Sequence, residues 1–155
     1  TEVESSFLAG MLHDLGKIVL DRYFADYYKS VTETAESEEI PIEQAEREIL
    51  GITHSEVGGQ LATEWKFSNN FLNTILHHHH PREARRGKRL VSVIHMADHF
   101  CRKLEFGSGG DSTVPEIDQS VLDQHSLGER GLQILEDAIL EDLDDANSFL
   151  AGLSG

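Results

Sequence analysis

Apolar residues recur with the spacing of an α-helix along almost the whole chain, and this pattern restricts the fold more than any other feature. In residues 7–20 they occupy one helical face, formed by Leu8, Met11, Leu12, Leu15, Ile18 and Val19. No segment alternates apolar and polar residues as a half-buried strand would. We therefore expect an all-α fold, a helical bundle of about six or seven helices.

Local signals mark the ends of several expected helices. Pro41 suits the first turn of a helix that runs to Leu50, and Gly51 suits its C-terminal stop. Thr53 and Glu56 form a capping box, S/T-x-x-E, which opens the next helix. The chain between residues 41 and 65 is therefore expected to form two helices joined by a short turn.

The second half of the chain is expected to be helical as well. Ser68 caps a helix that Pro81 ends, and a long buried helix follows over residues 90–104. Residues 106–115 (FGSGGDSTVP) form a loop. A last helix has one apolar face, formed by Leu132, Leu135, Ile139, Leu143, Ala146 and Phe149. We expect one domain, with residues 1–105 as its core and 106–155 as its loop and C-terminal helix.

The composition is that of a globular protein. Of the 155 residues, 39% are hydrophobic and 26% are charged. No apolar run approaches the roughly 18–20 residues that span a bilayer, and the N-terminus lacks a signal-peptide pattern. The single cysteine, Cys101, excludes a disulfide framework within the chain. We therefore expect a cytoplasmic location and no membrane partner.

The charge of the chain disfavours nucleic acid as a partner. The formal net charge is −15, whereas binding to DNA or to anionic lipid needs a positive surface. One basic segment is an exception and consists of Arg82, Arg85, Arg86, Lys88 and Arg89. Two interpretations of this segment stay open. It is either a solvated loop and helix start, or a contact for a phosphate or an acidic partner segment.

The strongest local motif is HDLGK, residues 13–17, late in an apolar helix. His13 and Asp14 lie among leucines, where burying them unpaired is costly. A divalent cation offsets that cost, because imidazole and carboxylate are both good ligands. Matching groups occur at three further places, which hold His54, the pair His78 and His79, and Asp98. We therefore expect a metal site.

Each of these groups also has an explanation without metal. The alternative for His54 is an ordinary residue in the first turn of its helix. Asp98 lies within one helical turn of His95 and Arg102, so a local ion pair is an alternative role. For His77 and His80 we expect a position in solvent or an indirect role.

The order of these motifs resembles that of a known family. The segments are FLAGMLHDLGKIVL (7–20), AEREILGITHSEVGGQLATEW (45–65), ILHHHHP (75–81) and HMAD (95–98). They resemble the HD superfamily of helical metal-dependent phosphohydrolases. The resemblance is closer to the HDOD branch, a signalling-associated output domain. It covers roughly residues 5–105 and implies an HD-domain-like helical bundle.

The resemblance implies roles for the candidate residues. The primary metal ligands would be His13, Asp14 and Asp98, and a second ion would be surrounded by His54, His78 and His79. One or two divalent ions are implied, of Fe, Mn, Ni, Mg or Zn. In an active enzyme Asp14 and Lys17 would take part in catalysis, with Lys17 on a phosphate oxygen. A solvent-facing lysine at a helix C-terminus is the alternative for Lys17.

The chain departs from the family pattern at two places. The family has a metal-binding histidine on a helix before the HD motif, and residues 1–12 contain no histidine. We therefore expect a fragment that lacks the N-terminal helices of an HDOD domain. The segment PREARRGKRL follows the histidines where cyclic-dinucleotide phosphodiesterases of the HD-GYP branch have a GYP-ending stretch. Hydrolysis of cyclic di-GMP is therefore not expected.

Three functions remain at this point. The first is an HDOD-type regulatory output domain of signal transduction with a divalent-metal site and weak or no catalysis. The second is an active metal-dependent phosphohydrolase, either a phosphodiesterase or a nucleotide phosphohydrolase. The third is a structural helical domain without metal. Expected partners are a phosphorylated small molecule or nucleotide, and other signalling domains or proteins. Because metal binding needs neutral imidazoles, affinity should weaken below roughly pH 6.

Overall fold

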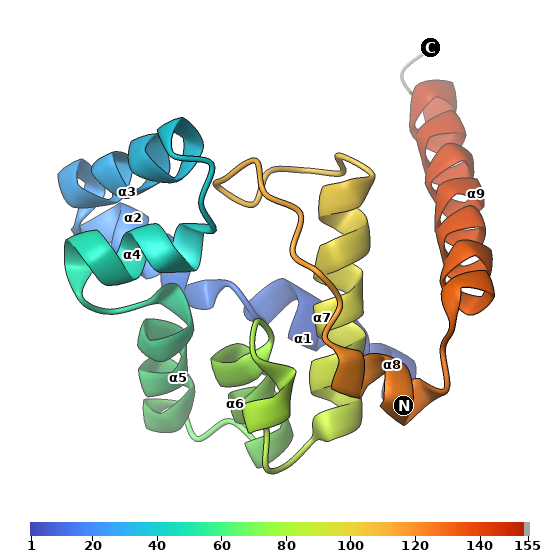
Figure 1. The fold of residues 1–155 in the computed structure, drawn as a ribbon, viewed down its shortest axis with the longest axis horizontal. Coiled ribbons are helices and arrows are strands. Elements are labelled where there is room, and N and C mark those ends of the chain that lie inside the picture. Colours follow the sequence, from blue (N-terminus) through green and yellow to red (C-terminus); the bar gives the residue numbers. More distant parts are fainter. Residues whose placement is uncertain (154–155) are drawn as a thin grey trace. The chain divides into compact units, whose positions relative to one another are not determined.

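The computed structural model describes the backbone of residues 1–153 and the side chains of residues 1–143. All regular structure in this part of the chain is helical, which confirms the predicted fold class (Figure 1). The α-helices are α1 Glu2–Leu12, α2 Leu15–Tyr23, α3 Ala25–Ser37, α4 Ile42–Leu50, α5 His54–Glu64, α6 Asn69–His77, α7 Lys88–Lys103, α8 Gln119–His125 and α9 Glu129–Leu153, and one 3₁₀ turn, η1, spans Pro81–Glu83.

The expected helix over residues 7–20 is divided in two, which is one reason why the helices outnumber the prediction. His13 is the C-terminal cap of α1, and Asp14 leaves the helical conformation with φ −98° and ψ 16°. The HD motif therefore lies between two helices rather than late in one. The apolar period continues across the break, so the sequence pattern did not reveal it.

The boundaries of α4 and α5 follow the predicted signals closely. Gly51 ends α4 with a φ of +71°, a left-handed conformation that favours glycine. The capping box at the start of α5 is confirmed, because the Glu56 amide donates to the Thr53 hydroxyl and the Thr53 amide donates to the Glu56 carboxylate. His54 is consequently the first residue of α5.

The chain divides into two compact units, Thr1–Asp118 and Gln119–Gly155. In the first unit α2, α3 and α4 enclose a cluster of buried side chains, and α5 packs against α2 and α6. The cluster consists of Leu20, Tyr28, Val31, Ala35, Ile42 and Ala45. The tight packing of α2, α3 and α4 supports the helices that carry the candidate site.

Helix α2 approaches α5 closely at one glycine of the HDLGK motif. A Cβ added to Gly16 would lie 1.9 Å from the carbonyl oxygen of His54, so only glycine fits here. Gly58 lies beside Gly16 and packs against Ile75 of α6. This contact brings the HD motif and His54 together, although they are forty residues apart in the sequence.

Helix α7 lines the other side of the first unit and packs against α1 and α6. Its buried residues include Val91, Ile94 and Phe100, whereas Ala97 and Cys101 are exposed. The helix is therefore half-buried, and the prediction that it is buried along its length is wrong.

The second unit contains α8 and α9. The expected C-terminal helix is present as α9, and the predicted apolar positions Ala146 and Phe149 lie outside the described side chains. Within the described residues, no helix combines the length and the apolar composition needed to cross a membrane.

Candidate metal centre

The break between α1 and α2 turns the HD side chains toward α5 and α6. His13 Nδ1 lies 2.7 Å from the Gly10 carbonyl oxygen and donates to it. A neutral ring that donates through Nδ1 carries its lone pair on Nε2. That nitrogen lies 3.4 Å from Asp14 Oδ2.

Two histidines lie close to the other oxygen of Asp14, and a third lies beside one of them. The distance from Asp14 Oδ1 is 3.3 Å to His54 Nε2 and 3.6 Å to His78 Nε2. His54 Nε2 is also 3.1 Å from His79 Nε2. Among the described residues, Asp14, His54, His78 and His79 offer ligand atoms that all lie within 4.8 Å of one another.

Two atoms of this group are buried without a hydrogen-bond partner, namely Asp14 Oδ1 and His78 Nε2. Unsatisfied buried polar atoms are rare in folded proteins and call for an explanation. His78 Nδ1 lies 3.0 Å from the Ile75 carbonyl oxygen and 3.2 Å from that of Thr74, so Nδ1 is the donor and Nε2 carries the lone pair. Three imidazoles and one carboxylate are a donor set for a divalent transition metal, so the residues fit such an ion.

The electrostatics of the centre keep its groups in the forms that bind metal. Burial alone would raise the pKa of Asp14, but His78, His13 and Lys17 hold that pKa well below its usual range. Burial, with His78 next in effect, holds the pKa of His79 far below its usual range. Burial likewise lowers the pKa of His13, although Asp14 opposes it. The carboxylate is therefore ionised and these imidazoles are neutral near pH 7.

Lys17 lies at the edge of this group. Its ammonium donates to Asp14 Oδ2 at 2.8 Å and to the Gly109 carbonyl oxygen at 3.0 Å. The side chain is 17% exposed, in the first turn of α2. The alternative of a solvent-facing lysine at a helix C-terminus is therefore wrong. Lys17 instead links the HD motif to the loop that follows α7.

His13 and Asp98, two of the six predicted metal ligands, lie outside the group of four. The His13 ring packs edge-on against the His78 ring, with 4.9 Å between ring centroids. Asp98 is partly buried on α7, and its charge acts on His13 and His95. The prediction that His13 and Asp98 bind metal stays a prediction.

His95 and Arg102, the two local partners considered for Asp98, make contacts with other residues. Arg102 pairs with Asp111 at 2.7 Å. His95 Nδ1 donates to the His78 carbonyl oxygen at 2.7 Å, and His95 Nε2 accepts from the Asp118 amide at 3.0 Å. His95 therefore ties the backbone of a candidate ligand to the end of the first unit.

His77 and His80 point away from the group of four. His80 is 58% exposed and pairs with Glu43 at 2.9 Å, and the hydrogen bond to Glu43 raises the pKa of His80. His77 lies 3.8 Å from Glu83. Both observations agree with the expectation of solvent-facing or indirect roles.

The basic segment after the histidines forms η1 and the start of α7. Arg82 pairs with Asp118 at 2.8 Å, and Arg89 pairs with Glu2 at 3.3 Å. Arg85, Arg86 and Lys88 are exposed. The choice between a solvated segment and a contact for phosphate therefore stays open.

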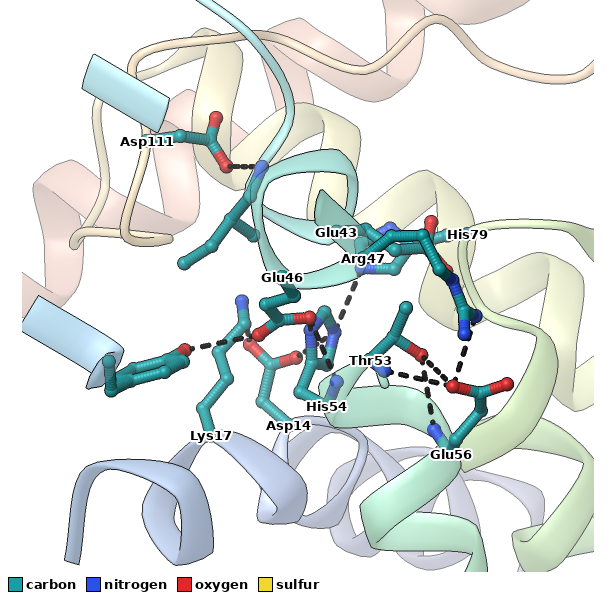
Figure 2. A network of polar contacts seen from close by, with 12 residues as sticks. Asp14, Lys17, Glu43, Glu46, Arg47, Thr53, His54, Glu56, His79 and Asp111 are labelled. Carbon is teal, nitrogen blue, oxygen red and sulfur yellow. Dashed lines mark hydrogen bonds and ion pairs between the residues drawn. The ribbon is translucent and has the colours of Figure 1, made fainter. Parts of the chain in front are cut away.

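One buried residue beside the centre was missed by the sequence interpretation. Glu46 on α4 is fully buried, and its carboxylate contacts the ring and the backbone of His54 (Figure 2). A signal for it exists, because Glu46 falls on the apolar face of its helix beside Ile42, Ala45 and Ile49. An acid in that position needs a partner.

Comparisons with known proteins identify the family of the chain. The HDOD domain family model matches residues 1–81, slightly more than half of the 155 residues. A crystal structure of an HDOD domain protein with unknown function from Geobacter sulfurreducens has a TM-score of 0.70 and 27% identity. That match covers 92% of this chain and 50% of the Geobacter chain.

A protein of Treponema pallidum (strain Nichols), described as uncharacterized, is 27% identical over 121 residues. The match covers 77% of this chain and 23% of the Treponema protein, so this chain spans less than a quarter of that relative. The family match, the helical fold and the histidine and aspartate cluster lead to one conclusion: the chain belongs to the HDOD domain family.

Proposed function

We propose that this HDOD domain is a regulatory output domain of signal transduction that binds a divalent metal ion and has weak or no catalysis. The ion would be held by Asp14, His54, His78 and His79. The observation that carries the proposal is that two buried atoms of the group of four, Asp14 Oδ1 and His78 Nε2, have no hydrogen-bond partner. An ion between them would satisfy both atoms.

The position of Lys17 supports one ion and weak catalysis. A bound ion would supply Lewis-acid chemistry and a water of lowered pKa. Two-metal hydrolysis would need protein ligand atoms that are free to hold a second ion close to the first. Here Lys17 already donates to the second oxygen, Asp14 Oδ2. Lys17 also donates to the Gly109 carbonyl oxygen, so the loop after α7 lies close to this oxygen of Asp14.

An active metal-dependent phosphohydrolase is the second candidate, and Lys17 is also the observation that favours it. A partly exposed ammonium beside a metal-binding carboxylate is suited to contact a phosphate oxygen. In that function Lys17 would give up its contact with Asp14 or Gly109 and contact the substrate instead. The substrate would be a phosphodiester or a nucleotide. For either function we propose a phosphorylated small molecule or nucleotide as ligand, and other signalling domains or proteins as partners.

Elemental analysis of the protein purified without a histidine tag tests the proposal. We expect about one Fe, Mn, Ni or Zn per chain, and no turnover of generic phosphodiesters or nucleotides with any of these ions or Mg²⁺. Turnover that disappears in Asp14→Ala would instead establish the phosphohydrolase. A chain that takes up none of these ions would refute both metal functions and leave a structural helical domain.

A further inference from the structure

We infer that Glu46 is a positioning residue that holds the His54 ring with its Nε2 lone pair facing the group of four. The inference deepens the proposed metal function and rests on it. Glu46 is fully buried, and carboxylates are seldom fully buried unless they are paired. The partners of the Glu46 carboxylate therefore indicate the role of this residue.

The contacts of Glu46 converge on one histidine. Glu46 Oε2 accepts the backbone amide of His54 at 2.8 Å and lies 2.7 Å from His54 Nδ1. Glu46 Oε1 accepts the Tyr28 hydroxyl at 3.4 Å. Figure 2 shows Glu46 reaching from α4 to the His54 ring, where it contacts Nδ1 while Asp14 lies near Nε2.

This geometry decides which ring nitrogen carries the proton. Since Oε2 already receives the backbone amide, it acts as an acceptor, and a ring nitrogen 2.7 Å away must donate to it. His54 Nδ1 therefore bears a hydrogen, and in the ring form that can bind metal Nε2 bears the lone pair. That Nε2 lies 3.3 Å from Asp14 Oδ1 and 3.1 Å from His79 Nε2. A carboxylate behind a histidine ligand fixes the ring and its tautomer and strengthens metal binding.

Helix α4 is itself held in a position that delivers this carboxylate. The Ile42 amide at the start of α4 donates to Asp111 Oδ2 at 3.0 Å, and Asp111 pairs with Arg102 in a buried ion pair. Ile42 and Ala45 on the same face belong to the buried cluster. The orientation of Glu46 is thus determined before any metal arrives.

The competing explanation is that Glu46 only stabilises the start of α5, because the His54 amide that it accepts is the first amide of that helix. The N-terminal cap of α5 offers a matched control for this structural role. Glu56 accepts the Thr53 amide at 2.9 Å in the same helix cap, and its carboxylate pairs with Arg47 at 3.0 Å rather than with the His54 ring. Glu56→Gln therefore perturbs the cap of α5, whereas Glu46→Gln perturbs the cap and the ring.

The first measurement is the tautomer of His54 in the metal-free chain. Histidine is labelled with ¹⁵N, the ring nitrogens are observed through their two-bond and three-bond proton couplings, and His54→Gln assigns the signal. We expect the Nδ1–H form in the wild type and in Glu56→Gln, and a mixture with the Nε2–H form in Glu46→Gln. An Nε2–H ring in the wild type would overturn the inference even if Glu46→Gln did not fold.

The second measurement is affinity for Zn²⁺ in competition with a chromophoric chelator. We expect Glu46→Gln to weaken binding roughly 10–100-fold and Glu56→Gln to leave it within about twofold. Equal losses in the two variants, or none in Glu46→Gln, would overturn the inference. If the wild type binds neither Zn²⁺ nor any other ion of the elemental analysis, the proposed metal function fails, and the tautomer measurement alone decides the positioning role of Glu46.

Discussion

The two sides of the HD motif are built differently. On the side of α5 and α6, His54 is held by Glu46 and His78 by two backbone carbonyls, and both rings are fully buried. On the side of α1 and α7, His13 is held by one carbonyl and remains partly exposed. Asp98 is partly buried and acts on His13 through its charge.

This difference indicates which side of the HD motif should contribute more to metal affinity. A side chain that is already oriented loses little conformational entropy when it binds an ion, whereas a loosely held one loses more. We therefore expect the α5–α6 side to supply most of the affinity. The α1–α7 side should adjust the affinity by smaller amounts.

The largest expected effect is that of Asp14→Asn, because Asp14 contacts both sides. The change keeps the shape of the side chain and removes the charge that three imidazoles surround. We expect the loss to exceed the roughly 10–100-fold typical of residues behind a ligand, so that the purified protein loses stoichiometric metal. Elemental analysis measures this directly. One ion per chain retained in Asp14→Asn would refute Asp14 as the central ligand.

The next effect compares His79→Ala with His13→Ala across the motif. His79 belongs to the group of four, and His13 does not. We expect His79→Ala to weaken Zn²⁺ binding by roughly 10–100-fold or more, and His13→Ala to weaken it by less than about tenfold. Chelator competition measures both affinities under the same conditions. A larger loss in His13→Ala would reverse the assignment of the two sides.

Lowering the pH of the metal-free protein probes both sides together. Burial lowers the folded-state pKa of His13 and of His79. Below the unfolded-state pKa of about 6.5, the unfolded chain binds protons that these folded rings do not. The free energy of unfolding should therefore fall as the pH drops from about 6.5 toward 5, by about 1.4 kcal/mol per pH unit for each proton taken up.

One neighbouring histidine acts in the opposite direction. The pKa of His80 is raised by its hydrogen bond to Glu43, so its stabilising contribution is present below about pH 6.5 and is lost as the pH rises through its folded pKa. Its exposure makes this contribution small. Urea unfolding at several pH values measures the balance, with His79→Gln and His13→Gln as controls for each side. A free energy of unfolding that stays level from pH 7 to 5 would contradict the prediction.

The smallest expected effect is that of Asp98→Asn. The change removes a charge that acts on His13 but keeps the size of the side chain. An electrostatic contribution of at most about 1 kcal/mol corresponds to a loss in Zn²⁺ affinity of no more than about fivefold. A loss as large as that of His79→Ala would show that Asp98 binds the ion directly. The two sides would then be equivalent.

Much of the fold could be predicted because its signals are local. The Thr53 capping box and the Gly51 helix end depend on neighbours within a few residues, and both appear as expected. The break at the HD motif was missed because the apolar period runs through it. The partner of Arg102 was missed because Asp111 reaches it through a loop of irregular backbone.

The candidate site was predicted in its members but not in its arrangement. The motif order named all four members of the close group together with His13 and Asp98, whose binding to metal stays a prediction. It gave no role to Glu46, whose position on an apolar helix face was the available signal. Pairing a buried acid with a histidine eight residues away requires the angle between two helices, which no local pattern contains.

The sequence by itself determined the helical class, several helix ends and the identity of the histidines and the aspartate in the group of four, because helical periodicity, capping and motifs are properties of short segments. The tertiary structure decided how these groups face one another. The close contact of Gly16 with His54 sets the distance between α2 and α5, and the packing of α4 brings Glu46 behind the His54 ring. Those distances depend on side-chain packing between segments far apart in the chain, and the physical character of the candidate metal centre depends on those distances.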